Sequence, residues 1–321
     1  MRRHLVLICA LVLAACGGGG GGGDGPSPAG DGPFAVGTTE MTFVDTSRST
    51  DSYADVPAKD SRTLFTRIYY PALGALESRA VPGAQPATSD GPYPLVVFAH
   101  GFQAVSEVYQ DIYVAWAEAG YVVAAPDFPL SSSRSTMNRP VSSDYVNQPA
   151  DLSFLIDRLT AESAREDGVL AGLVDPERIG ASGQSLGGMT TMGVAFNTCC
   201  VDRRIDAAIP MAGRLAPFPG GEYFTGIHTP ILVVHGDRDD TVPYADGRAI
   251  YDGASPPRFF LTILGGDHIV PYVAGPTNPL TAPIRRAVVA FFDFYLKGRR
   301  DGLDRLRAVD DGAIAKVEAD P

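Results

Sequence analysis

Gly183-Gln184-Ser185-Leu186-Gly187 is the most informative stretch of the chain. It has the form G-x-S-x-G, the pattern of a nucleophile elbow, in which a serine occupies a strained turn between a strand and a helix. Glycines two residues before and after the serine leave room for this backbone. A strand-like run precedes the turn at residues 178–182, and small residues follow at 188–195. Ser185 is therefore expected at the carboxyl edge of a sheet, beside a helix N-terminus that favours negative charge.

Apolar runs typical of strands buried on both faces recur on either side of this turn. These runs lie at residues 95–99, 121–125, 207–211, 231–234 and 259–264. Apolar residues at helical spacing occur at residues 110–119, 151–159 and about 283–296. Buried strands that alternate with helices predict an α/β fold with a mostly parallel central sheet and helices on both faces.

Two further strands are expected at residues 36–44 and 63–70, with only a polar loop between them. Because no helix connects them, they should form an antiparallel N-terminal edge of the sheet. The whole arrangement is that of the α/β-hydrolase fold. Residues 212–230 are too few for a helical lid at that point, so no large lid domain is expected and the active site should be open. The excursion at 130–148 could at most line the cleft.

The first 15 residues have the features of an export signal, because Arg2 and Arg3 precede a short apolar run. Leu13-Ala14-Ala15-Cys16 then resembles a bacterial lipobox, where cleavage exposes a cysteine that carries lipid. The alternatives are an ordinary signal peptide and an uncleaved anchor. The lipobox interpretation implies an exported protein of the cell envelope, lipid-anchored to a bacterial membrane through Cys16.

These features divide the chain into four parts. Residues 1–15 are expected to be a lipoprotein signal peptide, and residues 16–33 a flexible tether rich in Gly and Pro. Residues 34–300 should form the catalytic domain, and residues 301–321 a C-terminal tail. With 321 residues, 45% of them hydrophobic and 20% charged, the chain suits one globular domain, expected to be a monomer. The net charge of −11 argues against nucleic acid as a partner.

Four cysteines are present, and two of them remain once Cys9 leaves with the signal and Cys16 is lipidated. These are the neighbours Cys199 and Cys200. An exported protein meets an oxidising compartment, so a disulfide between them and a pair of buried thiols both stay open. A vicinal disulfide would have to distort the intervening peptide. No further metal ligands stand close by in the sequence, so no metal site is expected.

A serine hydroxyl becomes an effective nucleophile when a base removes its proton and a third group orients that base. In the α/β-hydrolase fold, the order along the chain is Ser, acid, His. Of the five histidines, His268 is the one that follows both Ser185 and the acidic segment after the strand at 231–234. It lies directly after the strand at 259–264, at the strand ends where the site is expected. The alternative is a histidine in a surface loop.

The acid is expected in the segment 235–243, where Asp237, Asp239 and Asp240 compete. This segment resembles the H-G-x-x-D-x-x-V-P signature of carboxylesterase-type members of the fold. The acid of that signature stands four residues before the proline, which selects Asp239. The other two aspartates would then have the non-catalytic role of forming the turn through Asx-type hydrogen bonds.

An oxyanion hole requires backbone N–H groups aimed at the developing negative charge. The residue after the nucleophile supplies one of them, which nominates the amide of Leu186. His100-Gly101-Phe102, after the strand at 95–99, resembles the H-G-x motif of the fold and nominates the amide of Phe102. The Phe102 ring could also face the cleft and pack on an acyl or aryl group. The alternative for this ring is a place in the core.

From about residue 36 to 296, the chain resembles the platelet-activating-factor-acetylhydrolase-like and dienelactone-hydrolase-like serine esterases of the α/β-hydrolase superfamily. The resemblance is carried by residues 61–64 and 68–72, the motif at 100–102, the elbow, and the segments around Asp239 and His268. The layout is more distantly similar to cutinases and polyester hydrolases, which are lidless. Those enzymes usually have His or Trp where this chain has Gln184, and a disulfide near the C-terminus, whereas no cysteine follows Cys200 here. Dienelactone hydrolases proper use a cysteine nucleophile, which Ser185 does not match.

The resulting hypothesis is a serine carboxylic-ester hydrolase that works through a Ser185–His268–Asp239 triad and an acyl-enzyme intermediate, without a cofactor. Its partner would be a small or bulky ester substrate. One alternative is a cutinase-like polyesterase or a lipase, which the missing lid favours. Another is a surface lipoprotein that keeps the fold and binds a ligand without catalysis.

Overall fold

The computed structural model describes residues 32–77, 79–137 and 139–321. The expected signal peptide, Cys16 and nearly all of the tether lie outside the described residues. In the described ranges, no helix is long and apolar enough to cross a bilayer.

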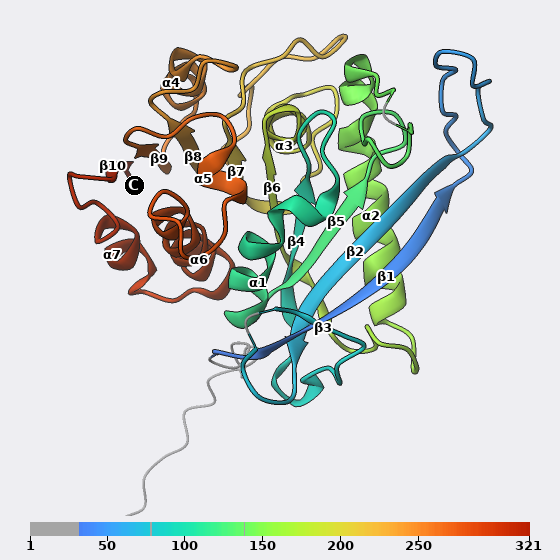
Figure 1. Ribbon diagram of the computed structural model, residues 1–321, viewed down its shortest axis with the longest axis horizontal. Coiled ribbons are helices and arrows are strands. Elements are labelled where there is room, and N and C mark those ends of the chain that lie inside the picture. The colour runs from blue at the N-terminus through green and yellow to red at the C-terminus, as the bar shows by residue number, and fades with distance from the viewer. Residues whose placement is uncertain (1–31, 78, 138) are drawn as a thin grey trace, which may run out of the picture.

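One twisted sheet runs through the domain, in the strand order β10-β9-β8-β7-β6-β4-β5-β2-β1-β3 (Figure 1). The strands are β1 (Ala35–Asp45), β2 (Arg62–Ala72), β3 (Val81–Pro82), β4 (Tyr93–Ala99), β5 (Val122–Asp127), β6 (Val174–Gln184), β7 (Ile205–Met211), β8 (Ile231–Gly236), β9 (Arg258–Ile263) and β10 (Ala315–Asp320). The six central strands, from β9 across to β5, are parallel to one another. β2 pairs antiparallel with both β5 and β1, which forms the predicted N-terminal edge.

Helices cover both faces of this sheet (Figure 1). They are α1 (Gln110–Glu118), α2 (Gln148–Ser163), α3 (Leu186–Phe196), α4 (Tyr244–Gly253), α5 (Val270–Val273), α6 (Thr281–Lys297) and α7 (Gly302–Arg307), with the 3-10 segments η1 (Thr88–Asp90), η2 (Ser106–Tyr109) and η3 (Ser142–Asn147). One hydrophobic core gathers residues of α2, α3 and α4, and a second gathers residues of α1, α5, α6 and α7. Each side of the sheet thus has its own core, and the loops at the strand ends stay free to form a site.

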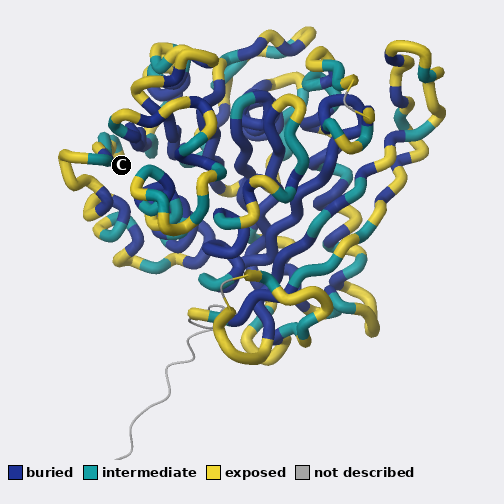
Figure 2. Tube along the Cα trace, in the orientation of Figure 1, coloured by how far each residue is buried: buried dark blue, intermediate teal, exposed yellow. Residues whose placement is uncertain are grey.

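Burial explains why the central strands could be recognised in the sequence. Every residue of β4 and β5 is buried, as is every residue of α3 (Figure 2). Strands with both faces covered read as continuous apolar runs, and a helix buried all round must be built from small and apolar residues. The segment 212–230 between β7 and β8 contains no helix, which agrees with the expected absence of a large lid there.

Residues 301–321 do not form a C-terminal tail, contrary to the expectation from the sequence. α7 packs on α6, and β10 pairs antiparallel with β9 along its whole length. The turn before β10 is shaped by Asp311, whose carboxylate accepts hydrogen bonds from the N–H groups of Ala315, Ile314 and Ala313. These backbone hydrogen bonds lower the pKa of Asp311 to about 2. The segment is therefore an integral edge of the sheet.

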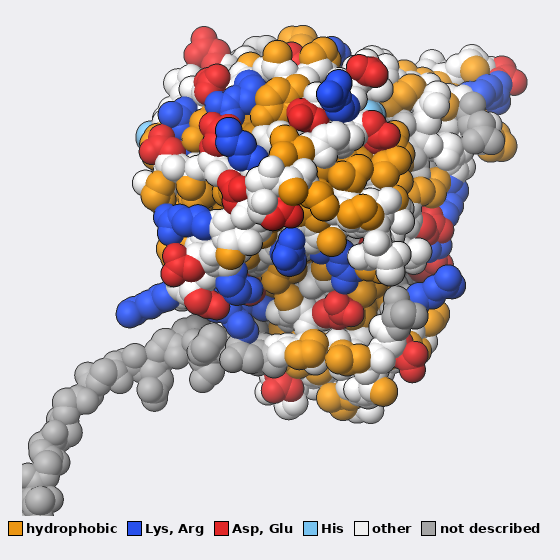
Figure 3. All heavy atoms as spheres, turned by 60° about the vertical axis from the view of Figure 1, so that its left-hand side comes forward, with side chains coloured by type: hydrophobic (Ala, Val, Ile, Leu, Met, Phe, Trp, Pro, Cys, Tyr) orange, Lys and Arg blue, Asp and Glu red, His pale blue; other side chains and the backbone are white. Residues whose placement is uncertain are grey.

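Ion pairs also fasten this last strand. Arg248 of α4 lies 2.8 Å from Glu318, and Arg258 of β9 lies 3.0 Å from Asp320. On the face drawn in Figure 3, Lys and Arg side chains are interspersed with Asp and Glu. Charges of both signs are therefore mixed on this face, in spite of the negative net charge of the chain.

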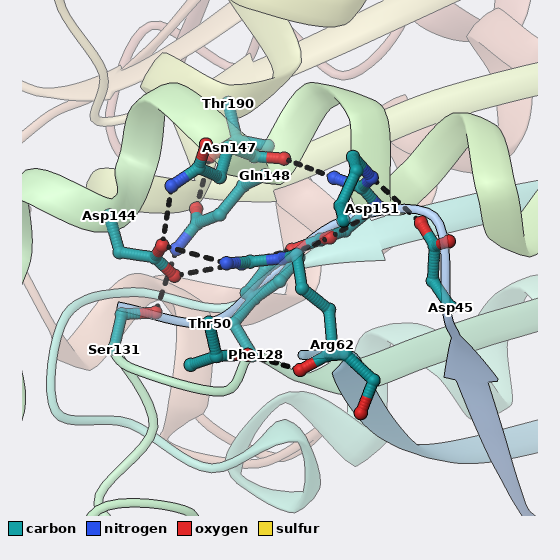
Figure 4. A network of polar contacts seen from close by, with 12 residues as sticks. Asp45, Thr50, Arg62, Phe128, Ser131, Asp144, Asn147, Gln148, Asp151 and Thr190 are labelled. Atoms are coloured by element: carbon teal, nitrogen blue, oxygen red, sulfur yellow. Dashed lines mark hydrogen bonds and ion pairs between the residues drawn. The ribbon is translucent and has the colours of Figure 1, made fainter. Parts of the chain in front are cut away.

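A buried ion-pair network joins the start of β2 to the segment that leads into α2 (Figure 4). The guanidinium of Arg62, which is 1% exposed, donates to both carboxylate oxygens of Asp151 at 2.7 Å. It also donates to both oxygens of Asp144, at 3.0 and 2.9 Å. Burial on its own would lower the pKa of Arg62, but its hydrogen bonds to the two aspartates outweigh burial and raise this pKa. Arg62 therefore fixes η3 and the first turn of α2 against the sheet.

Replacement of Arg62 by Met should lower the free energy of unfolding by about 3–5 kcal/mol, because the buried Asp144 then loses its cation and the buried Asp151 keeps only the partly exposed Arg48, at 2.8 Å. Arg67→Met is the matched control on the same strand. The side chain of Arg67 is 24% exposed and pairs with the partly exposed Glu40 and Glu107 at 2.8 and 2.5 Å, so its loss should cost about 1 kcal/mol or less. Urea unfolding of both variants measures the difference. Equal costs for the two replacements would contradict the importance of the buried network.

Candidate active site

Ser185 occupies the turn between β6 and α3 with φ 59° and ψ −117°, a backbone conformation that a non-glycine residue rarely adopts. The turn can close because Gly183 and Gly187, two residues before and after the serine, have no side chains. A Cβ on Gly187 would overlap the carbonyl group of Ala99 at the end of β4, and a Cβ on Gly183 would overlap Gly187. The amide of Ser185 donates to the carbonyl oxygen of Met211 at 2.9 Å, which fixes the turn from the β7 side. The predicted elbow is therefore present, with its strain at the serine.

The structure brings together the three residues that the sequence predicted as a triad. His268 Nε2 lies 2.8 Å from Ser185 Oγ, and His268 Nδ1 lies 2.7 Å from Asp239 Oδ2. With the proton on Nδ1, the imidazole donates to Asp239 and accepts from the serine hydroxyl. Ser185 follows β6, Asp239 follows β8 and His268 follows β9, so three parallel strands deliver their loops to one edge.

Asp239 is buried, whereas Asp237 and Asp240 are exposed. Its second oxygen accepts the N–H groups of Thr241 and Val242 at 2.9 and 2.8 Å, so the carboxylate is held in place. Asp237 instead accepts the N–H of Gly265 at 2.7 Å, so it joins the loop after β8 to the loop after β9 rather than closing an Asx-type turn of its own. The geometry thus singles out Asp239 among the three aspartates.

His235 also lies beside Asp239, although no role for it was predicted from the sequence. Its Nε2 donates to the carbonyl oxygen of Val242 at 3.0 Å and lies 3.3 Å from Asp239 Oδ2. Burial lowers the pKa of His235, which keeps the ring neutral near pH 7. A neutral His235 supports the acid loop without competing with His268 for the negative charge.

The two predicted oxyanion donors come from two different segments of the chain. Leu186 is the first residue of α3, and Phe102 lies in the loop that follows β4. Among the described residues, neither amide donates to a backbone carbonyl, so both N–H groups are free for a ligand. The Phe102 side chain is 39% exposed, which excludes the alternative that it is a core aromatic.

The oxyanion loop is held in place by its own neighbours. His100 is fully buried, and its ring lies 2.7 Å from the carbonyl oxygen of Gly101 while it accepts the amide N–H of Phe128 at 3.1 Å. Burial lowers the pKa of His100, so a neutral ring can serve as donor and acceptor at once. On the other side of Phe102, the amide of Gln103 donates to the carbonyl oxygen of Ser131 at 3.0 Å.

A small apolar cluster lies on the helix that begins directly after the serine. A small cluster of Leu186, Met189 and Ala216 packs with the half-buried ring of Tyr145. The Tyr145 ring in turn contacts the Phe218 ring, with centroids 5.2 Å apart. The sequence predicted only that the excursion containing Tyr145 could line the cleft, because no local pattern shows that a 3-10 segment packs against an elbow helix 40 residues later.

Cys199 and Cys200 are joined as a vicinal disulfide just after α3, which resolves the alternatives that the sequence left open. Asp127, at the end of β5, accepts the amide N–H of Ser106 at 2.7 Å and an Arg134 guanidinium N–H at 2.6 Å. It therefore joins the end of β5 to η2 and to Arg134. Neither feature contacts the Ser185–His268–Asp239 group through a hydrogen bond among the described residues.

Comparison with known proteins shows the family of the chain. Residues 84–300 match a family model described as PET hydrolase-like. The chain belongs to the PET hydrolase-like family. PET hydrolases are polyester hydrolases, the group that the sequence resembled only more distantly, through its lidless layout.

Individual relatives of this PET hydrolase-like chain are ester hydrolases by name. A bis(hydroxyethyl) terephthalate hydrolase from Streptomyces coelicolor is 29% identical over 289 residues, which cover 86% of this chain and 79% of the relative. A platelet-activating factor acetylhydrolase from Bos taurus is 24% identical over 66% of this chain and 60% of its own. The solved structure of a ferulic acid esterase from Streptomyces cinnamoneus superposes with a TM-score of 0.65 and 25% identity, over 85% of this chain and 93% of the other. The predicted α/β-hydrolase fold and the carboxylic-ester hydrolase class are thereby confirmed.

Proposed function

We propose that the chain hydrolyses its ester through an acyl-enzyme on Ser185. The observation that carries this proposal is the bridging position of His268, whose two ring nitrogens lie within 2.8 Å of Ser185 and Asp239. His268 takes the proton of the serine hydroxyl as Oγ attacks the ester carbonyl, and Asp239 stabilises the resulting imidazolium. His268 then gives the proton to the departing alcohol. Water repeats the sequence on the acyl-enzyme and releases the acid.

The amides of Leu186 and Phe102 are proposed to stabilise the oxyanion of each tetrahedral intermediate. Both N–H groups lie free beside the nucleophile, one at a helix N-terminus and one in the loop after β4. Donors that are already oriented cost no reorganisation when the charge develops. All groups needed for this chemistry belong to the chain itself, so no cofactor takes part.

The substrate is proposed to be an ester with an aromatic acid or another flat apolar group. The exposed Phe102 ring, the exposed Ile269 next to the base, and the half-buried Tyr145 offer apolar surface around the nucleophile. Two relatives, the bis(hydroxyethyl) terephthalate hydrolase and the ferulic acid esterase, are named for esters of aromatic acids. Hydrolysis of a polyester surface is the second candidate, supported by the family match and by the open segment between β7 and β8.

Replacement of Ser185 by Ala should reduce kcat/KM on esters by about a thousandfold or more, because the nucleophile is lost while the fold remains. The assay uses p-nitrophenyl esters from acetate to palmitate, bis(hydroxyethyl) terephthalate and polyester film. Ser182→Ala is the matched control, since this buried serine of β6 donates only to the carbonyl oxygen of Ile209. It should cost about 1 kcal/mol of stability and leave turnover largely intact.

The substrate series separates the candidates. A preference for the terephthalate diester supports the aromatic-ester proposal, and release of product from film supports a polyesterase. Near-wild-type turnover by the Ser185→Ala variant would contradict the mechanism. A wild-type protein that hydrolyses none of these esters and does not react with a fluorophosphonate would instead point to a binding lipoprotein.

We also propose that the mature protein is an exported monomer, tethered to a bacterial membrane by lipid on Cys16. The support is the sequence Leu13-Ala14-Ala15-Cys16, followed by a Gly-rich stretch before the domain begins. With a mature surface of negative charge, attachment would depend on the acyl chains rather than on attraction to anionic lipid.

Cys16→Ser should move the protein from the membrane fraction to the soluble fraction of the cells that express it. Metabolic labelling with an alkyne fatty acid should mark the wild-type protein and leave the variant unmarked. Cys199→Ser, which alters another cysteine of the same chain, should keep the label. Equal labelling of wild type and Cys16→Ser would refute the anchor.

A further inference from the structure

Gln184, the residue before the nucleophile, uses its side-chain amide on two separate loops. Its Nε2 donates to the main-chain carbonyl oxygen of His268 at 2.8 Å, and its Oε1 accepts the hydroxyl of Tyr109 at 2.8 Å. Both side chains are 2% exposed. The amide therefore holds the residue that carries the base, from a position covalently adjacent to the serine.

Tyr109 extends this connection to the oxyanion loop. Its hydroxyl accepts the amide N–H of Gly101 at 3.0 Å, and Gly101 directly precedes the proposed oxyanion donor Phe102. Burial raises the pKa of Tyr109, so the hydroxyl keeps its proton and can donate to Gln184 while it accepts from Gly101. The ring is fixed by aromatic contact with Phe98, at a centroid distance of 5.0 Å.

Gly101 packs so closely against Gln184 and Tyr109 that no space is left for a side chain at this position. A Cβ on Gly101 would lie 2.8 Å from Gln184 Oε1 and 2.9 Å from the Tyr109 hydroxyl oxygen. The oxyanion loop thus rests directly on the Gln184–Tyr109 pair, which is why a glycine is required there. A shift of either side chain would displace the loop.

We propose that Gln184 and Tyr109 are positioning residues that set the oxyanion loop and the base loop relative to Ser185 as one unit. This inference rests on the proposed function and adds two residues to it. The three groups that must meet come from the loops after β4, β6 and β9, which are far apart in the sequence. An amide has one donor and one acceptor end in a fixed geometry, so it can hold both partners at once. Neither residue touches the reacting atoms in this role.

The test compares Gln184→Met and Tyr109→Phe with the control Tyr93→Phe. Met has a volume similar to that of Gln but no amide, so Gln184→Met removes both hydrogen bonds and keeps the packing. Tyr109→Phe removes the hydroxyl that joins Gly101 to Gln184. Tyr93→Phe also deletes a buried hydroxyl, one that donates to the carbonyl oxygen of Ala87 at 2.6 Å near the start of β4.

Turnover of p-nitrophenyl acetate is measured per active site, with the sites counted by a fluorophosphonate. Gln184→Met and Tyr109→Phe, the two relay variants, should each lose about tenfold or more in kcat, with KM changed by less than about threefold. Misplaced groups affect the transition state more than they affect substrate binding. The inhibition constant of phenylboronic acid, which forms a tetrahedral adduct, should rise by the same factor. The double variant should lose little more than the larger single loss, since both residues act in one chain of hydrogen bonds. Tyr93→Phe should change neither quantity.

Unchanged kcat per site and an unchanged boronic acid constant in either relay variant would overturn the proposal, whatever the change in stability. If Gln184→Met does not fold, Tyr109→Phe decides the matter alone by the same two measurements. A wild-type protein that neither hydrolyses the ester nor reacts with the fluorophosphonate would overturn the proposed function itself, and with it this inference. A wild type that is active beside relay variants that are equally active would overturn the inference alone.

Discussion

The structure depends on a close approach of three backbones at the elbow. α3 starts so near the end of β4 that any side chain on Gly187 would overlap the Ala99 carbonyl group, and Gly183 faces Gly187 under the same restriction. This crowding forces Ser185 into its positive φ and points the hydroxyl at the strand ends. The strain is tolerated because α3 is wholly buried and β6 lies at the centre of the sheet. The most costly local conformation is thus supported by the most stable surroundings.

Buried side-chain amides lie near this turn and connect it to the loops of the site. Gln184 links the elbow to the base loop, while Gln148 at the start of α2 donates to Ser131 Oγ at 2.8 Å and accepts from Thr190 of α3 (Figure 4). Ser131 in turn receives the amide of Gln103, next to the oxyanion donor. The oxyanion loop is therefore held at two points. Gln184 acts on it through Tyr109, and Gln148 acts on it through Ser131.

The sequence predicted the centre of the molecule well and its periphery less well. Strands such as β4 and β5 are buried on both faces, so their apolar runs are visible in the sequence, and Ser185 and His268 follow from motif and chain order. β10 was missed because a short edge strand with exposed residues has no such run. α4 was missed because only three of its ten residues are buried.

Contacts between distant segments were also out of reach. Arg62 meets its acidic partners 82 and 89 residues away, and Tyr145 meets α3 only once both are folded. No local pattern records such a meeting. The role of Gln184 belongs to the same class, since its hydrogen bond reaches the carbonyl oxygen of His268, 84 residues away.

The most direct test of the account is to trap the acyl group during turnover. A slowly deacylating aryl ester is mixed with the protein, the reaction is quenched in acid within milliseconds, and the digested peptides are analysed by mass spectrometry. The account predicts that the acyl mass appears on the peptide that contains Ser185, with fragment ions that place it on that serine, and that it decays at the rate of turnover. Turnover accompanied by no acylated peptide, or by an acyl group on another residue, would contradict it.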